Sequence, residues 1–161
     1  MISDTMTDQL TDPVPSPVSL VIPCRPEYVA LCRLVAGAIG MNDGLDDEAV
    51  ADIKVIVTEA CDCFLGMASG SAGDAGSCGG ATKGAVDPDC SIRMEFDSRP
   101  DQFVISVLYP EKRELVSWLE SCDPLSEAGL GLTILKALAD DMVELADPEG
   151  TILRLTKRLQ A

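Results

Sequence analysis

The 161-residue sequence contains no histidine, few aromatic residues and few basic ones. Twelve Lys and Arg stand against 27 Asp and Glu, and the net charge of −15 opposes binding to nucleic-acid phosphates and favours basic protein partners. No run of about 18 uncharged apolar residues is present, so no transmembrane helix is expected. Hydrophobic residues make up 47% and aromatic residues 4% of the chain, which predicts one domain with an aliphatic core.

Cysteine is abundant, but its spacing is irregular. The N-terminus shows neither the basic stretch nor the apolar stretch of a secretory signal. An odd number of scattered cysteines therefore predicts reduced thiols and no disulfide framework. Cys61 and Cys63 point in different directions on a helix, and no histidine assists them, so we expect no metal site. The seven cysteines are at positions 24, 32, 61, 63, 78, 90 and 122.

The first half of the chain predicts a disordered segment, a strand and a helix. Residues 1–17 are acidic and contain three alternating prolines, which predicts an extended, disordered start. Residues 18–22 are rich in β-branched side chains and predict a strand. Pro26 fits the first turn of a following helix. Apolar residues repeat at helical spacing as far as Ile39, and Gly40 is expected to end the helix.

A second helix is predicted from Asp46, which fits an N-cap. Glu59 lies beside its apolar stripe and near its end. Residues 66–87 hold seven of the thirteen glycines and predict a flexible loop. That loop is not a phosphate-binding P-loop, because no Gly-Lys-Ser/Thr follows at the required spacing. The predicted stripe consists of Ala49, Ile53, Ile56, Ala60 and either Cys63 or Phe64.

The second half predicts four strands and a helix. The first two strands are joined by a turn at residues 97–101, and a helix is predicted at about 130–139. The segment 110–128 between them is mixed and polar. Residues 18–161 therefore predict one α+β domain, a two-layer sandwich whose mixed, mostly antiparallel sheet carries three helices on one face. The four predicted strands are 91–96, 103–108, 142–146 and 151–156.

Four stretches, in this order and at this spacing, resemble the bacterial anti-sigma factors and serine-protein kinases of the GHKL ATPase superfamily. The resemblance extends over residues 18–158. It implies a GHKL (Bergerat) sandwich, a site for ATP and Mg²⁺, a cytoplasmic homodimer, and partner switching in a stress response between a sigma factor and an anti-anti-sigma antagonist. The stretches are IPCRPEYV at 22–29, IKVIVTEAC at 53–61, GLGLTIL at 129–135 and GTILRLTK at 150–157.

The same resemblance assigns roles to three residues. Glu59 matches the family's general base, which polarises the hydroxyl group of a partner's serine. A carboxylate in that role needs hydrogen-bond reach to the hydroxyl proton and a rigid support. Gly129 and Gly131 match the second glycine segment, which lines the nucleotide phosphates at the start of a helix.

Two other positions depart from the family pattern. Cys63 stands where the family has an asparagine that ligates magnesium, and a thiol is a poor ligand for a hard cation. Tyr109 stands where an aspartate accepts a hydrogen bond from the adenine amino group, and the glycines that follow that aspartate are absent. Both departures argue against binding of ATP and Mg²⁺.

Three functions remain open from the sequence. The first is an anti-sigma-factor-like regulator that binds partner proteins and has weakened or lost ATP binding. The second is an active serine-protein kinase that phosphorylates an anti-anti-sigma antagonist through Glu59. The third is a redox or metal sensor that uses Cys61, Cys63 and Cys78.

Overall fold

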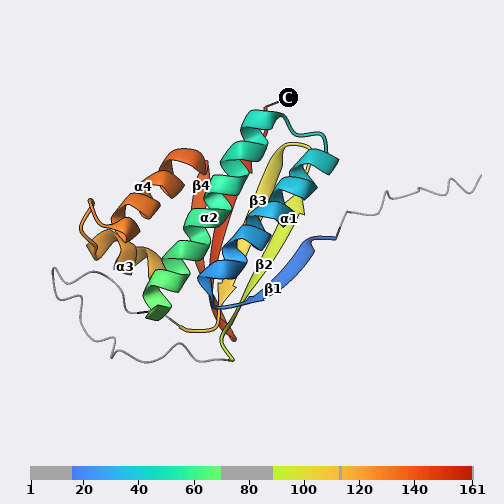
Figure 1. Ribbon diagram of the computed structural model, residues 1–161. Coiled ribbons are helices and arrows are strands. Elements are labelled where there is room, and N and C mark those ends of the chain that lie inside the picture. Colours follow the sequence, from blue (N-terminus) through green and yellow to red (C-terminus); the bar gives the residue numbers. More distant parts are fainter. Residues whose placement is uncertain (1–15, 70–88, 113, 161) are drawn as a thin grey trace, which may run out of the picture.

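The computed structural model describes residues 16–69, 89–112 and 114–160, which form an α+β sandwich of two layers (Figure 1). The predicted fold class is confirmed. The strands are β1 (Val18–Pro23), β2 (Ser91–Ser98), β3 (Gln102–Tyr109), β4 (Asp141–Asp147) and β5 (Gly150–Arg158). The helices are a short 3₁₀ helix η1 (Pro26–Tyr28), α1 (Val29–Asn42), α2 (Asp47–Ser69), α3 (Leu115–Ser121) and α4 (Glu127–Leu138).

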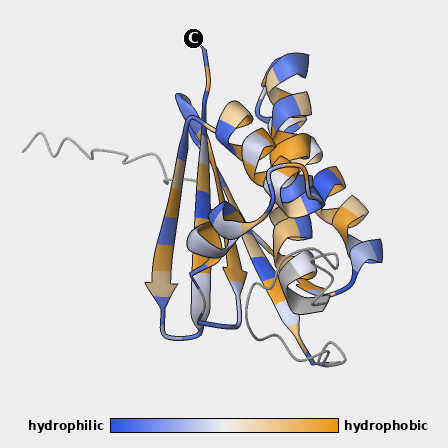
Figure 2. Cartoon of the chain, turned by 90° about the vertical axis from the view of Figure 1, so that its left-hand side faces the viewer, coloured by the Kyte–Doolittle hydropathy of each residue, from blue (hydrophilic) through white to orange (hydrophobic). Residues whose placement is uncertain are grey.

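The five strands form one sheet in the order β1-β2-β3-β5-β4, and every neighbouring pair is antiparallel. The side chains of β2 and β3 alternate between buried and more exposed positions, as expected for a sheet covered on one face. The helices pack on the covered face, and Figure 2 shows the two layers from the side. The strand residues that face the helices include Ile92, Met94, Phe96, Phe103, Ile105 and Val107, all at most 1% exposed.

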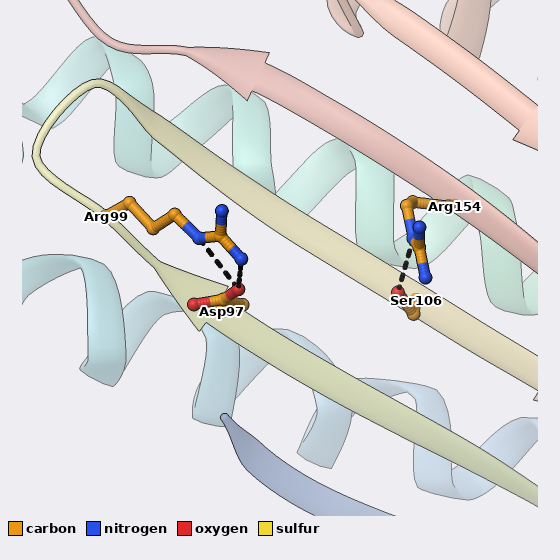
Figure 3. A network of polar contacts seen from close by, with 4 residues as sticks. All are labelled: Asp97, Arg99, Ser106 and Arg154. Atoms are coloured by element: carbon orange, nitrogen blue, oxygen red, sulfur yellow. Dashed lines mark hydrogen bonds and ion pairs between the residues drawn. The ribbon is translucent and has the colours of Figure 1, made fainter. Parts of the chain in front are cut away.

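The open face of the sheet carries polar contacts (Figure 3). The Arg99 guanidinium donates to the Asp97 carboxylate at the turn between β2 and β3. Further along the sheet, Arg154 Nε donates to Ser106 Oγ at 3.5 Å. The two arginines are exposed and their partners are half-buried, so each contact contributes little to stability. Their presence is consistent with a face that water covers.

Helix α1 is longer than predicted. It does not end at Gly40 but continues to Asn42, and the chain then turns at Gly44, whose φ is +76°. Gly40 is buried, and a Cβ atom there would lie 3.2 Å from Cγ2 of Val50. This glycine therefore permits the close approach of α1 to α2, and the left-handed glycine comes four residues later.

Helix α2 begins as predicted, because the backbone N–H of Ala49 donates to Asp46 Oδ1 at 2.7 Å. Five of the six residues named for the predicted stripe are at most 3% exposed, and Ala49 is half-buried. The helix continues through Ser69, so residues 66–69 belong to it and not to the predicted loop. The rest of that loop lies outside the described residues, as does most of the predicted disordered start.

The segment 110–128 contains a helix, α3, that the sequence analysis did not predict. Leu115 and Leu119 are buried and form the inward-facing side of this helix. The Glu144 carboxylate accepts a hydrogen bond from the backbone N–H of Val116 at 2.7 Å. Helix α4 begins three residues earlier than predicted, where Ser126 caps it by accepting from the N–H of Gly129.

The expectation that all seven cysteines are reduced is wrong for two of them. Cys24 and Cys90 form a disulfide with their Cα atoms 5.5 Å apart. The register of β1 and β2 brings them together across 66 residues, a relation that spacing alone does not reveal. Four other cysteines are free thiols, and position 78 lies outside the described residues. Among the described helices, none has both the length and the apolar character needed to cross a membrane.

Candidate functional site

Helices α2 and α4 lie side by side and bring three of the predicted site residues together (Figure 1). A Cβ atom on Gly131 would lie 3.0 Å from Oε2 of Glu59 and 3.6 Å from Sγ of Cys63. The absence of a side chain at Gly131 therefore allows α4 to approach the catalytic candidate on α2. At this point the two helices contact each other directly.

Gly129 has a different environment. A Cβ atom there would collide with the backbone oxygen of Asp123 and lie 2.8 Å from the Cα atom of Pro124. Its N–H group already donates to Ser126 Oγ at 3.2 Å. The glycine is thus required by the close turn that precedes α4, and its amide is satisfied within the chain.

Tyr109 is part of the core. Its side chain is 1% exposed, and its ring stacks on that of Phe64 with 5.1 Å between the ring centroids and 25° between the ring planes. Phe64 comes from α2, one residue after Cys63, and is itself fully buried. The phenol at the predicted adenine-contact position is therefore packed against the helix of Glu59.

Burial and a neighbouring charge raise the pKa of two carboxyl groups near the contact between α2 and α4. Partial burial raises the pKa of Glu59, and the charge of Asp62 adds to this effect. Desolvation and the charge of Glu127 raise the pKa of Asp62 in the same way. Three acidic groups thus make this region unfavourable for a polyphosphate unless a cation neutralises it.

The residue at the predicted metal position is a poor ligand for magnesium. Burial, followed by the charge of Glu59, raises the pKa of Cys63 to about 12, so the side chain is a neutral thiol at pH 7. Magnesium requires oxygen ligands in octahedral geometry. Among the described residues, no group of three or more Cys, Asp or Glu is placed to hold a metal ion. The thiol of Cys63 therefore does not fit the family's Mg²⁺.

The buried thiols also bear on the sensor hypothesis. A hydrogen bond with Cys32, together with burial, strongly raises the pKa of Cys61. We predict that iodoacetamide at pH 8 alkylates the partly exposed Cys122 well before Cys61 or Cys63, because only the thiolate reacts and the two buried thiols stay protonated. Peptide mass spectrometry over time measures the rates, with urea-unfolded protein as the control. Equal rates for Cys63 and Cys122 in the folded protein would contradict this.

Glu59 should make stability depend on pH. Its folded-state pKa lies above its unfolded one, so the folded protein binds more protons between the two values. The contribution of this carboxyl group to the free energy of unfolding is fully present below its pKa in the unfolded state. It is lost as the pH rises through its pKa in the folded state. We expect Glu59→Gln to unfold at higher urea concentration than wild type at pH 7 and to show a flatter pH profile. Glu95→Gln, on the exposed face, is the control, and identical profiles for Glu59→Gln and wild type would refute the assignment.

A hollow of about 830 Å³ lies elsewhere, at the start of α2. Its walls include Asp52 and Lys157, which form an ion pair of 2.8 Å. Lys157 also donates to the backbone oxygen of Leu138 at 3.1 Å, so its charge is used within the chain. Asp52 and Glu59 are seven residues apart on one helix, about 10 Å along its axis. The hollow is therefore separate from the contact between α2 and α4.

The sequence analysis missed two parts of this site. It placed Phe64 in a buried stripe but did not pair its ring with Tyr109. It also left the turn at Asp123 and Pro124 unassigned, although proline followed by a serine cap and two glycines is typical of a close helix entry. The first omission concerns a contact between segments 45 residues apart, which no local pattern reports. The second is local, and the pattern around Pro124 could have indicated it.

Comparisons with known proteins agree with this arrangement. The model of the histidine kinase-like ATPase domain matches residues 22–157. A serine-protein kinase RsbW of Bacillus pumilus is 27% identical over 152 residues, covering 88% of this chain and 85% of that protein. A serine-protein kinase RsbW of Listeria innocua is 29% identical over 150 residues, covering 87% and 85%. An anti-sigma-F factor RsbW of Mycobacterium tuberculosis is 28% identical over 130 residues, covering 81% and 62%. The chain belongs to the histidine kinase-like ATPase domain family, with the GHKL-type α+β fold.

Proposed function

We propose that this protein is an anti-sigma-factor-like regulator that acts by binding partner proteins in a partner-switching circuit and has lost the use of ATP. The observation that carries the proposal is the packing of Tyr109 against Phe64, beside the protonated thiol of Cys63. An adenine ring would compete with the phenol for space, and a magnesium ion would lack its oxygen ligand. The relatives named as anti-sigma factor and serine-protein kinase support the choice of circuit.

An exposed apolar stripe on α1 supports protein binding. Leu31, Leu34, Ala38 and Met41 repeat at spacings of three and four residues, so they share one side of the helix. The three larger side chains are 42%, 67% and 67% exposed. Exposed apolar patches of this kind mark interaction surfaces. We assign this stripe to the sigma factor or its antagonist, and we propose a cytoplasmic homodimer as the working form.

Binding to a sigma factor of the same organism tests the proposal. We expect Leu34→Glu to weaken binding by about tenfold or more, because it places a charge in an apolar contact. Leu125→Glu is the matched control, since this leucine is 84% exposed but lies in the turn before α4. Adding Mg-ATP should not change the affinity of the unmodified protein. No binding, or equal losses in both variants, would contradict the proposal.

One observation favours the alternative, an active serine-protein kinase. Glu59 is half-buried on a helix, and burial raises its pKa, which makes its carboxylate a stronger general base. The kinase would transfer phosphate from ATP to a serine of the antagonist, and Glu59→Ala would abolish this transfer. Incubation of the antagonist and the protein with labelled Mg-ATP distinguishes the two proposed functions. Transfer of label to the antagonist would support the kinase, and no transfer would support the regulator that acts by binding alone.

A further inference from the structure

Cys24 and Cys90 lie opposite each other where the chain leaves the sheet for α1. The ladder between β1 and β2 ends at the pair Pro23 and Ser91, and the two cysteines are the next residues. The N–H of Cys24 donates to the backbone oxygen of Cys90 at 3.0 Å. Their Cα separation of 5.5 Å lies within the usual range for a disulfide. The backbone therefore places the two cysteines within reach of a disulfide.

The disulfide secures a weakly held part of the fold. Strand β1 is at the edge of the sheet and pairs only with β2. After Cys24, only Arg25 separates the strand from η1 and α1. The bond thus connects the edge strand and the start of α1 to Cys90, the residue immediately before β2. An edge strand opens more readily than a central one, so a covalent bond here has a large effect on local opening.

The two cysteines differ in exposure. Cys24 is 3% exposed, whereas Cys90 is only partly buried. Three of the free thiols, Cys32, Cys61 and Cys63, are buried and do not compete for a reagent in solution. A small thiolate would therefore attack at Cys90 and displace the sulfur of Cys24.

We propose that Cys24 and Cys90 form a reversible thiol switch that locks β1 and the start of α1 under oxidising conditions. In the closing direction, a low-molecular-weight disulfide accepts two electrons. The Cys90 thiolate attacks it, which gives a mixed disulfide and one free thiol. The Cys24 thiol then loses its proton and attacks the Cys90 sulfur, which forms the protein disulfide and releases the second thiol. The opening direction reverses these steps with two small thiols, which leave as one disulfide.

This inference goes beyond the proposed function, because the thiol–disulfide exchange requires no partner protein and no nucleotide. In a reducing compartment an accessible disulfide persists only while an oxidising disulfide accumulates, so the bond would report the redox state. The stripe proposed for partner binding lies on α1, the helix whose start the bond holds.

A redox titration tests the exchange. The purified chain is equilibrated in mixtures of reduced and oxidised glutathione, acid-quenched and alkylated, and Cys24 and Cys90 are followed by peptide mass spectrometry. We expect both to change together in one two-electron transition, while Cys61 and Cys63 remain thiols at every ratio. If the pair stays reduced at every ratio, or if each cysteine instead keeps a glutathione, the switch is refuted.

Thermal unfolding and hydrogen exchange test the lock. We expect the oxidised protein to melt roughly 10 °C above the reduced protein. Amides of β1 and the first turn of α1 should exchange faster after reduction, while those of α4 should not. Cys24→Ala and Cys90→Ala should each melt at one temperature in both buffers, and Cys122→Ser, the matched control, should respond like wild type. Equal melting temperatures for oxidised and reduced wild type would overturn the proposal and leave the proposed function untouched.

Discussion

Replacing Tyr109 by alanine is expected to lower the free energy of unfolding by about 3–5 kcal/mol. The side chain is 1% exposed and stacked on Phe64, so its removal leaves a cavity between β3 and α2 that neighbouring residues fill only in part. The stacking itself adds about 0.5–1.5 kcal/mol beyond the burial of area. Urea unfolding, followed by circular dichroism at constant pH, measures the change.

Phe64→Ala and the double variant separate the ring pair from the rest of the core. The two single losses should not add in the double variant, because each mutation already removes the stacking contact. Leu20→Ala, at a half-buried position in β1, is a control remote from the pair and should cost less. A loss below about 1 kcal/mol for Tyr109→Ala would mean that the ring lies outside the core and leaves room for a ligand.

Gly129→Ala is expected to lower the free energy of unfolding by about 1–3 kcal/mol, towards the upper end of that range. The added methyl group would collide with the backbone of Asp123 and Pro124, and backbone atoms cannot move aside as a side-chain end can. The turn before α4 must shift, and the contact between α4 and α2 must shift with it. Urea unfolding measures the loss, and amide exchange in α4 reports the shift.

Gly66→Ala is the matched control for this substitution. Gly66 lies within α2, and a Cβ atom there would have no atom within 4 Å, so alanine should raise the free energy of unfolding by about 0.5–1 kcal/mol. Opposite signs for the two variants would assign Gly129 to close packing. If Gly129→Ala does not change stability, the turn at Asp123 and Pro124 does not contact this glycine. A role of Gly129 in lining an anion-binding site would then be the better explanation for the glycine.

Local chemistry made most of the fold predictable. The Asp46 cap and the turn at residues 97–101 depend on hydrogen bonds or turn preferences within a few residues, and both were predicted. Gly40 shows where this approach fails. Glycine ends a helix or permits close packing, and only the position of Val50 in the next helix decides between the two.

The candidate site was predictable in part. Glu59, Cys63 and Gly131 do meet, as the order of the four resembling stretches implied. The stack of Tyr109 on Phe64 and the bond between Cys24 and Cys90 were not predictable, because each joins segments more than forty residues apart. The stack depends on how α2 packs on the sheet, and the bond depends on the register of β1 and β2. Helix α3 was missed because its two buried leucines give too short a pattern for a helix to be recognised.

Calorimetric titration of the purified protein with Mg-ATP tests the proposed loss of nucleotide binding. We expect no saturable heat up to millimolar nucleotide, because the proposal assigns the buried phenol of Tyr109 to the purine contact and the neutral thiol of Cys63 to the metal ligand. The relative named serine-protein kinase RsbW of Bacillus pumilus serves as the comparison protein. Saturable, magnesium-dependent binding in the micromolar range that Glu59→Gln alters would contradict the account and establish a working nucleotide site.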